Sequence, residues 1–266
     1  PYYCLLQKMI DIHMVSAWQH DTQVFEALSL RVETGEKVAI LGPNGSGKSS
    51  LLKLVSREIY PVVRPNSWDK LFGSENVNLW ELRSKIGLIS QDLQEDYTPY
   101  TTAMDVILSG FFGAIGSHAH LHADADQLQR AEELLHGVGM DEYRDTMFQR
   151  LSTGQKRRLL AARALVHNPS ALIFDEPFNG LDIRASADLF ALMRDFCLAE
   201  NSLVLTTQHV DEIIPEIDRV VLLQAGKVIA DDAKQVVLTS ESLSRLYGLP
   251  LQLSEQGGWY RLGMDT

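Results

Sequence analysis

The sequence predicts an α/β fold with a mostly parallel core sheet, an N-terminal antiparallel β subdomain and an inserted helical subdomain. Short apolar runs typical of buried strands alternate with stretches of helical spacing. Residues 42–49 fit the phosphate-loop pattern G-x-x-x-x-G-K-[ST] and stand between such a strand and such a helix. Strand patterns stop between about residues 92 and 167. We therefore expect a single domain over 1–266, with 1–91 and 168–266 as core and 92–167 as helical subdomain.

Composition narrows the functional class. The 266 residues carry a net charge of −11, which argues against nucleic acid as the main partner. The most apolar region, residues 104–116, is too short to span a bilayer, and no secretory signal is visible. Cys4 and Cys197 are too few for a disulfide scaffold. We expect a cytoplasmic chain, whose role at a membrane would need a separate spanning partner.

Three short strands are predicted before the loop, around residues 9–15, 24–32 and 38–41. Trp18 is expected in the first turn. Its ring would either stack on an adenine base or pack on the edge of the sheet. The third strand leads directly into the phosphate loop.

The loop chemistry predicts a nucleoside triphosphate site. Glycines let the backbone approach a polyphosphate, and backbone amides with the helix N-terminus supply partial positive charge. Lys48 adds a full charge at the β- and γ-phosphates, and Ser49 can ligate Mg²⁺. The residues expected to bind ATP here are Gly42, Pro43, Asn44, Gly45, Ser46, Gly47, Lys48, Ser49 and Ser50.

Residues 61–67 are expected to form a loop and 68–72 another strand. Residues 86–90 form a buried strand pattern that ends at Gln91. Ligands gather beyond the carboxyl ends of parallel strands, so Gln91 would reach Mg²⁺ or a nucleophilic water there. A solvated loop glutamine is the alternative.

The helical segment contains two predicted helices. Residues 124–136 place Leu128, Ala131, Leu134 and Leu135 on one face. Ser152 and Gln155 have capping-box spacing before a second helix over 156–167. Such a helix start also presents N–H groups and a hydroxyl to an anion, so a role in capping the helix and a role in binding an anion can hold together.

The strand over residues 171–174 runs straight into Asp175 and Glu176. Adjacent carboxylates at a strand end suggest that Asp175 holds Mg²⁺ and that Glu176 orients or deprotonates the attacking water. After a turn at 179–182 and a helix over 183–198, the strand 203–207 ends near His209, which would bind the γ-phosphate or lie on the surface. A hairpin over 219–230 and short helices over 233–247 complete the chain, with Gly248 as a cap.

Taken in order, these motifs resemble the nucleotide-binding subunit of ATP-binding cassette (ABC) transporters over nearly the whole chain. The motifs are the phosphate loop, Gln91, residues 151–155, the acidic strand end at 175–176, Leu181-Asp182 and His209. The resemblance implies a head-to-tail dimer, either a homodimer or a pair with another ABC subunit. ATP would lie between the phosphate loop of one copy and the signature residues of the other: Ser152, Thr153, Gly154 and Gln155.

The resemblance also implies roles for single residues. Glu176, His209 and Gln91 would be catalytic, and Ser49, Gln91 and Asp175 would hold Mg²⁺. Asp182 would communicate between the two sites, and Trp18 would stack on adenine. Thr153 departs from the glycine usual in the family, and would either crowd the partner's nucleotide or be tolerated.

Residues 207–215 and 237–248 further resemble ATPases of importers for iron chelates, cobalamin and molybdate. We expect an ATPase bound to the inner face of the cell membrane through a separate integral membrane permease, importing a metal chelate or an oxyanion. The alternatives are a soluble ABC ATPase that acts on ribosomes or nucleic acid, and the motor of an exporter.

Overall fold

The computed structural model describes residues 7–62, 64–115 and 122–264, and the chain divides into two compact units. The first unit comprises residues 1–79 and 196–266, and the second comprises residues 80–195. The predicted helical segment, residues 92–167, lies within the second unit. Cys4 lies outside the described residues.

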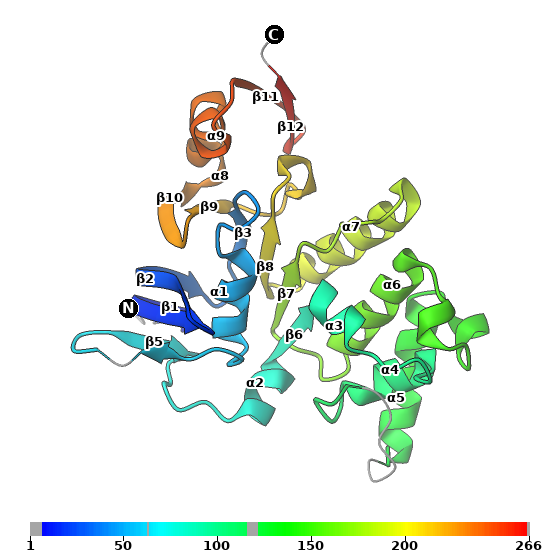
Figure 1. Cartoon of the computed structure of the whole chain (residues 1–266). Coiled ribbons are helices and arrows are strands. Elements are labelled where there is room, and N and C mark those ends of the chain that lie inside the picture. The colour runs from blue at the N-terminus through cyan, green and yellow to red at the C-terminus, as the bar shows by residue number, and fades with distance from the viewer. Residues whose placement is uncertain (1–6, 63, 116–121, 265–266) are drawn as a thin grey trace, which may run out of the picture. The chain divides into compact units, whose positions relative to one another are not determined.

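The first unit begins with an antiparallel sheet around β1 (Lys8–Gln19), which pairs with β2 (Thr22–Glu33), β4 (Pro61–Val62) and β5 (Trp68–Leu71) (Figure 1). Two predictions are corrected here. Trp18 is not in the turn but in β1, paired with Gln23, because the ladder continues through polar residues to Gln19 and Thr22. Part of the expected loop 61–67 is the edge strand β4, where a proline is tolerated.

The same unit contains the parallel strands that lead to the phosphate loop. β3 (Lys37–Leu41) lies between β8 (Ser202–Thr207) and β9 (Arg219–Gln224), parallel to both. β10 (Lys227–Ala233) forms the predicted hairpin with β9. β3 is apolar after Lys37, and β8 carries Leu203, Val204 and Leu205 between polar residues. Nearly every residue of both strands is buried, as expected for strands covered on both faces. The helix α1 (Lys48–Val55) follows the loop as predicted.

The C-terminal part of the first unit comprises η3 (Val210–Glu212), α8 (Lys234–Val237), α9 (Ser240–Tyr247), β11 (Leu251–Gln256) and β12 (Trp259–Met264). Gly248 ends α9 with a positive φ of 72°, as predicted. The hairpin β11–β12 was not predicted. Its signal was present, because the pair Gly257-Gly258 between two alternating runs is typical of a tight hairpin turn.

The second unit contains the parallel pair β6 (Ile86–Ile89) and β7 (Ala171–Asp175). Its helical elements are α2 (Leu79–Lys85), α3 (Gln91–Glu95), α4 (Ala103–Ser109), α5 (Ala125–Gly137), η1 (Asp141–Tyr143), η2 (Phe148–Arg150), α6 (Thr153–Ala164) and the start of α7 (Ile183–Leu198). α4, α5 and α6 pack together (Figure 1).

The predicted apolar face of α5 is correct except at one residue. Ala131, Leu134 and Leu135 are buried, whereas Leu128 is 38% exposed. Leu128 lies in the first turn of the helix, on the N-terminal side of the three buried residues. α6 begins three residues before the predicted start, and its capping residue is Ser152. No helix among the described residues has the length and apolar character needed to cross a bilayer.

Candidate functional site

The phosphate loop forms a tight turn between β3 and α1. Gly45 and Gly47 have φ values of 76° and 107°, which favour glycine. A Cβ on Gly42 would lie 2.3 Å from the Leu223 carbonyl oxygen in β9, so the loop starts at a position with no room for a side chain. The Gly226 amide, in the turn between β9 and β10, donates to the Ser46 carbonyl oxygen at 2.8 Å.

The N-terminus of α1 lacks a side-chain cap. Gly47 occupies the N-cap and makes no side-chain hydrogen bond, whereas Ser90, Thr102, Asp124, Ser152 and Thr239 each cap their own helices. The first amides of a helix need an acceptor. Those of α1 therefore fit a bound anion such as a phosphate group.

Lys48 is the first residue of α1, at the same helix N-terminus. Its side chain is buried, and its Nζ donates to the carbonyl oxygens of Gly42 at 2.8 Å and Pro43 at 3.1 Å. These bonds hold the ammonium group over the loop. The loop thus offers a full positive charge next to uncapped amides, the donor set that a polyphosphate requires.

The end of β1 reaches the first turn of α1. The Ser50 hydroxyl donates to Gln19 Oε1 at 3.2 Å, and Trp18 precedes Gln19 in the strand. Trp18 is half-buried. The structure therefore brings the segment of Trp18 to the phosphate loop, although it is in a strand and not in the expected turn.

His209 follows β8 at the same edge. The Gly42 amide donates to the Thr207 carbonyl at 3.2 Å, so the end of β8 adjoins the start of the loop. The Thr207 hydroxyl accepts a hydrogen bond from the His209 amide at 2.9 Å and donates to the Glu212 carboxylate. The His209 side chain is exposed.

In the second unit, the acidic strand end takes a strained conformation. β7 ends at Asp175, and Glu176 follows with a φ of 43°, uncommon for a residue other than glycine. Asn179 Nδ2 donates to Glu176 Oε2 at 2.9 Å, and both side chains are half-buried. Sequence reasoning did not select Asn179, because a turn asparagine carries no signal of its own.

Arg157 is a second residue that sequence reasoning missed. It is only 2% exposed in α6, and its Nε and Nη1 have no hydrogen-bond partner among the described residues. Burial lowers the pKa of Arg157, and the Asp175 carboxylate opposes this effect. A guanidinium keeps its proton even so, and Arg157 therefore supplies positive charge within electrostatic reach of Asp175.

The predicted capping box at the start of α6 is confirmed. Ser152 Oγ accepts from the Gln155 amide at 3.2 Å, and Gln155 Oε1 accepts from the Ser152 amide at 2.9 Å. A Cβ on Gly154 would lie 2.7 Å from the Cβ of Ala185 in α7, so this position needs glycine. The Thr153 side chain is half-buried, and a Cβ placed on Gly180, in the turn before α7, would lie 3.7 Å from its γ-methyl group, an ordinary van der Waals distance.

Asp182 and Gln91 both hydrogen-bond within their own helices. Asp182 Oδ1 accepts from the Ala185 amide at 2.8 Å and so caps α7. Gln91 Nε2 donates to Glu95 Oε1 at 2.9 Å across one turn of α3. Both side chains are exposed.

The predicted site residues thus fall into two sets. In the first unit, the structure brings together the phosphate loop, the segment of Trp18 and the segment of His209. The second unit carries Gln91, the Ser152–Gln155 segment, Asp175, Glu176 and Asp182. The catalytic and metal-binding roles of these residues stay predictions.

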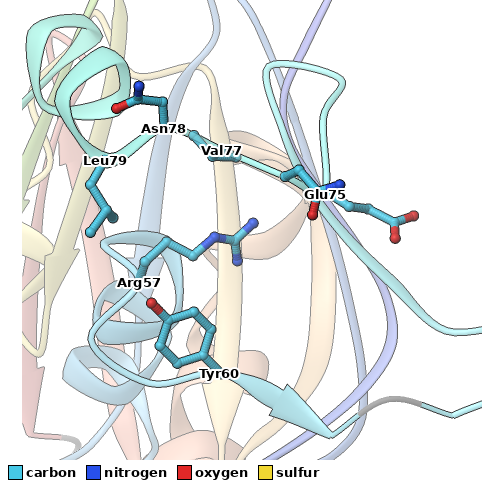
Figure 2. Close-up of a pocket in the computed structure, with 7 residues that line it drawn as sticks. Arg57, Tyr60, Glu75, Val77, Asn78 and Leu79 are labelled. Carbon is cyan, nitrogen blue, oxygen red and sulfur yellow. The ribbon is translucent and has the colours of Figure 1, made fainter.

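Figure 2 shows a pocket of about 390 Å³ in the first unit. Arg57 lines it and forms a buried ion pair with Asp69, in which burial raises the pKa of Asp69 and the Arg57 charge opposes this. The other lining residues are Tyr60, Glu75, Asn76, Val77, Asn78 and Leu79. None of the predicted ATP-binding residues belongs to this pocket.

The sequence profile of the family described as "ABC transporter" matches residues 25–179. The chain is 32% identical over 250 residues to the "Uncharacterized ABC transporter ATP-binding protein YlmA" of Bacillus subtilis (strain 168), which covers 92% of this chain and 93% of the relative. It is 33% identical over 238 residues to the "Cobalt import ATP-binding protein CbiO" of Rhodobacter capsulatus, which covers 88% of this chain and 81% of the relative.

A solved ABC transporter described as of the metal-chelate type, in an inward-facing conformation, has a TM-score of 0.76 and 23% identity. The match covers 97% of this chain and 96% of that chain. This likeness confirms the predicted α/β fold. The profile match and the relatives confirm the resemblance read from the motifs. The chain belongs to the ABC transporter family, as an ATP-binding subunit with ATPase activity.

Proposed function

We propose that this chain couples Mg-ATP binding and hydrolysis in a head-to-tail dimer to transport through a separate membrane permease. The observation that carries the proposal is the uncapped N-terminus of α1 beside the buried Lys48 ammonium, in a chain of this family. Residues 1–91 and 168–266 would form the nucleotide-binding core, and residues 92–167 would form the subdomain that carries the signature.

Each site of the dimer would be built from both copies. The phosphate loop and Lys48 would bind the phosphates, Trp18 would stack on adenine, and Ser49, Gln91 and Asp175 would hold Mg²⁺. The metal ion would neutralise charge on the phosphates during transfer. Gln91 would have to leave Glu95 for this task, which costs little because the bond between them is exposed.

Glu176 would accept the proton of the attacking water, and His209 would bind the γ-phosphate. The bond from Asn179 to Glu176 Oε2 would hold the carboxylate in place for this step. Asp182, at the start of α7, would pass the state of one site to the other.

The capping box does not conflict with the signature role of Ser152. A serine hydroxyl carries two acceptor lone pairs and one proton. The Gln155 amide occupies a lone pair, and the proton remains for the γ-phosphate bound by the partner copy. Thr153 would be tolerated in this scheme, because its side chain is half-buried within its own copy.

The permease would hold the chain at the inner face of the membrane, and the cargo would be a metal chelate or an oxyanion. The cobalt importer subunit among the relatives supports a metal-linked cargo. The net charge of −11 disfavours a soluble ATPase acting on ribosomes or nucleic acid. The motor of an exporter remains the second candidate.

The test uses tagged Glu176→Gln protein, which should bind Mg-ATP without turning it over, expressed in its native cell and extracted in mild detergent. We expect a multi-span membrane protein to co-purify. The membrane protein is then placed in liposomes together with the wild-type chain, and uptake of Co²⁺ chelates and of molybdate is measured. Liposomes that carry the membrane protein with Glu176→Gln protein are the inactive control. Recovery of ribosomes or DNA without a membrane protein would overturn the transport role.

A further inference from the structure

The C-terminal segment, residues 234–264, holds the stretch that follows β8 and contains His209. β12 lies beside η3 (Figure 1). The Tyr247 hydroxyl at the end of α9 donates to the Gln208 carbonyl oxygen at 2.6 Å. This bond joins residues that are 39 positions apart in the chain.

The C-terminal end of this stretch, at Ile214 and Pro215, is also bound by the C-terminal segment. The buried Lys234 ammonium donates to the Pro215 carbonyl at 2.9 Å and the Ile214 carbonyl at 3.4 Å. A Cβ on Gly258, at the tip of the β11–β12 hairpin, would lie 2.9 Å from Pro215 Cβ. The hairpin tip therefore packs closely on Pro215.

Tyr247 completes the hydrogen bonding of one peptide unit. The peptide between Gln208 and His209 has two polar groups, a carbonyl and an N–H. Tyr247 binds the carbonyl, and the Thr207 hydroxyl binds the N–H at 2.9 Å. With both groups bound, this peptide plane cannot rotate without breaking a hydrogen bond, and the plane sets the direction in which the His209 side chain leaves the backbone.

We propose that Tyr247 is a positioning residue, which fixes the peptide before His209 and so keeps the imidazole at the edge of the sheet where the γ-phosphate is to bind. The proposal rests on the function proposed for His209. Burial, reinforced by the nearby Glu212 carboxylate, raises the pKa of Tyr247 to about 12. The hydroxyl therefore keeps its proton, and can donate it, throughout the physiological pH range.

The test compares Tyr247→Phe in the wild-type and His209→Ala backgrounds. Tyr247→Phe removes one hydrogen bond and keeps the ring. We expect kcat for ATP hydrolysis to fall about three- to tenfold, the effect of one hydrogen bond, with KM for ATP within twofold of wild type. In the His209→Ala background, adding Tyr247→Phe should leave the residual rate unchanged, because the residue that it positions is gone.

Tyr260→Phe is the matched control. Tyr260 is another buried tyrosine of the C-terminal segment, and the Lys234 ammonium lies 5.8 Å from its ring centroid. This variant should keep the wild-type rate. An equal loss from Tyr247→Phe in both backgrounds, or no loss in either, would overturn the proposal.

Imidazole NMR resonances give a readout that does not depend on catalysis. The His209→Ala variant identifies the His209 signal among those of the 8 histidines. Tyr247→Phe should shift or broaden that signal, and Tyr260→Phe should not. An unchanged His209 signal in Tyr247→Phe would refute the positioning role, whereas full activity of His209→Ala would refute only the role proposed for His209.

Discussion

At the residue scale, the proposed base Glu176 takes a backbone conformation that costs about 1 kcal/mol for an L-residue, with a φ of 43°. Asn179 bonds to it twice, through its side chain at 2.9 Å and through its amide to the Glu176 carbonyl at 3.3 Å. Strain of this kind persists where neighbours over-determine the conformation. Asn179 is thus one of the neighbours that hold Glu176 in its position.

Asn179→Ala should therefore lower kcat about five- to tenfold with little change in KM for ATP, because it removes a hydrogen bond to a charged group and leaves the phosphate loop intact. Steady-state ATP hydrolysis measures both constants. The exposed Asn76→Ala serves as control and should match wild type. A rise in KM with an unchanged kcat would show that Asn179 supports ATP binding instead.

At the scale of elements, α7 carries a buried thiol with a defined pH response. Cys197 is 7% exposed, and burial, with smaller effects of the charges around it, raises its pKa from 9.0 to about 11. Between about pH 9 and 11, the Cys197 thiol therefore keeps its proton in the folded state and loses it in the unfolded state. The stability that Cys197 contributes is fully present below pH 9 and is lost as the pH rises through 11.

Between pH 8 and 10.5, the Cys197→Ala variant should lose less stability than the protein that keeps Cys197, with a difference of about 2 kcal/mol. Unfolding in urea at both pH values measures it, with Cys4→Ser in both proteins to remove the other thiol. Tyrosines and lysines titrate equally in the two proteins and cancel. Parallel losses of stability would mean that the Cys197 thiol titrates normally.

Elements marked by local chemistry could be predicted from the sequence. The capping box at Ser152 and Gln155, the helix α7 and the β9–β10 hairpin agree with their predictions, because each depends on a few neighbouring residues. The position of Trp18 was wrong because pairing along a ladder decides where a strand ends. The bond from Tyr247 to Gln208 could not be predicted, since no short-range pattern records a contact between distant residues. The site roles carried over from the family stay predictions.

At the scale of the whole molecule, the function proposed here needs two copies of the chain. Each site would take Lys48 and Glu176 from one copy and Ser152 from the other. Lys48→Ala should abolish the sites that its own loop forms, and Ser152→Ala should abolish the sites of its partners. Each variant alone should therefore hydrolyse ATP at a small fraction of the wild-type rate.

Mixing these two inactive proteins should restore activity. In a mixed dimer, the Ser152→Ala copy still provides an intact loop and the Lys48→Ala copy still provides Ser152, so one of the two sites is complete. The recovered rate should rise with the extent of dimer formation, measured by size-exclusion chromatography in Mg-ATP. A chain carrying both substitutions, mixed with the Ser152→Ala chain, completes no site and should restore nothing. Suppose that Glu176→Gln protein dimerises in Mg-ATP but the mixture of single variants stays inactive. That result would contradict a site that is built from both copies and hydrolyses ATP independently of the second site.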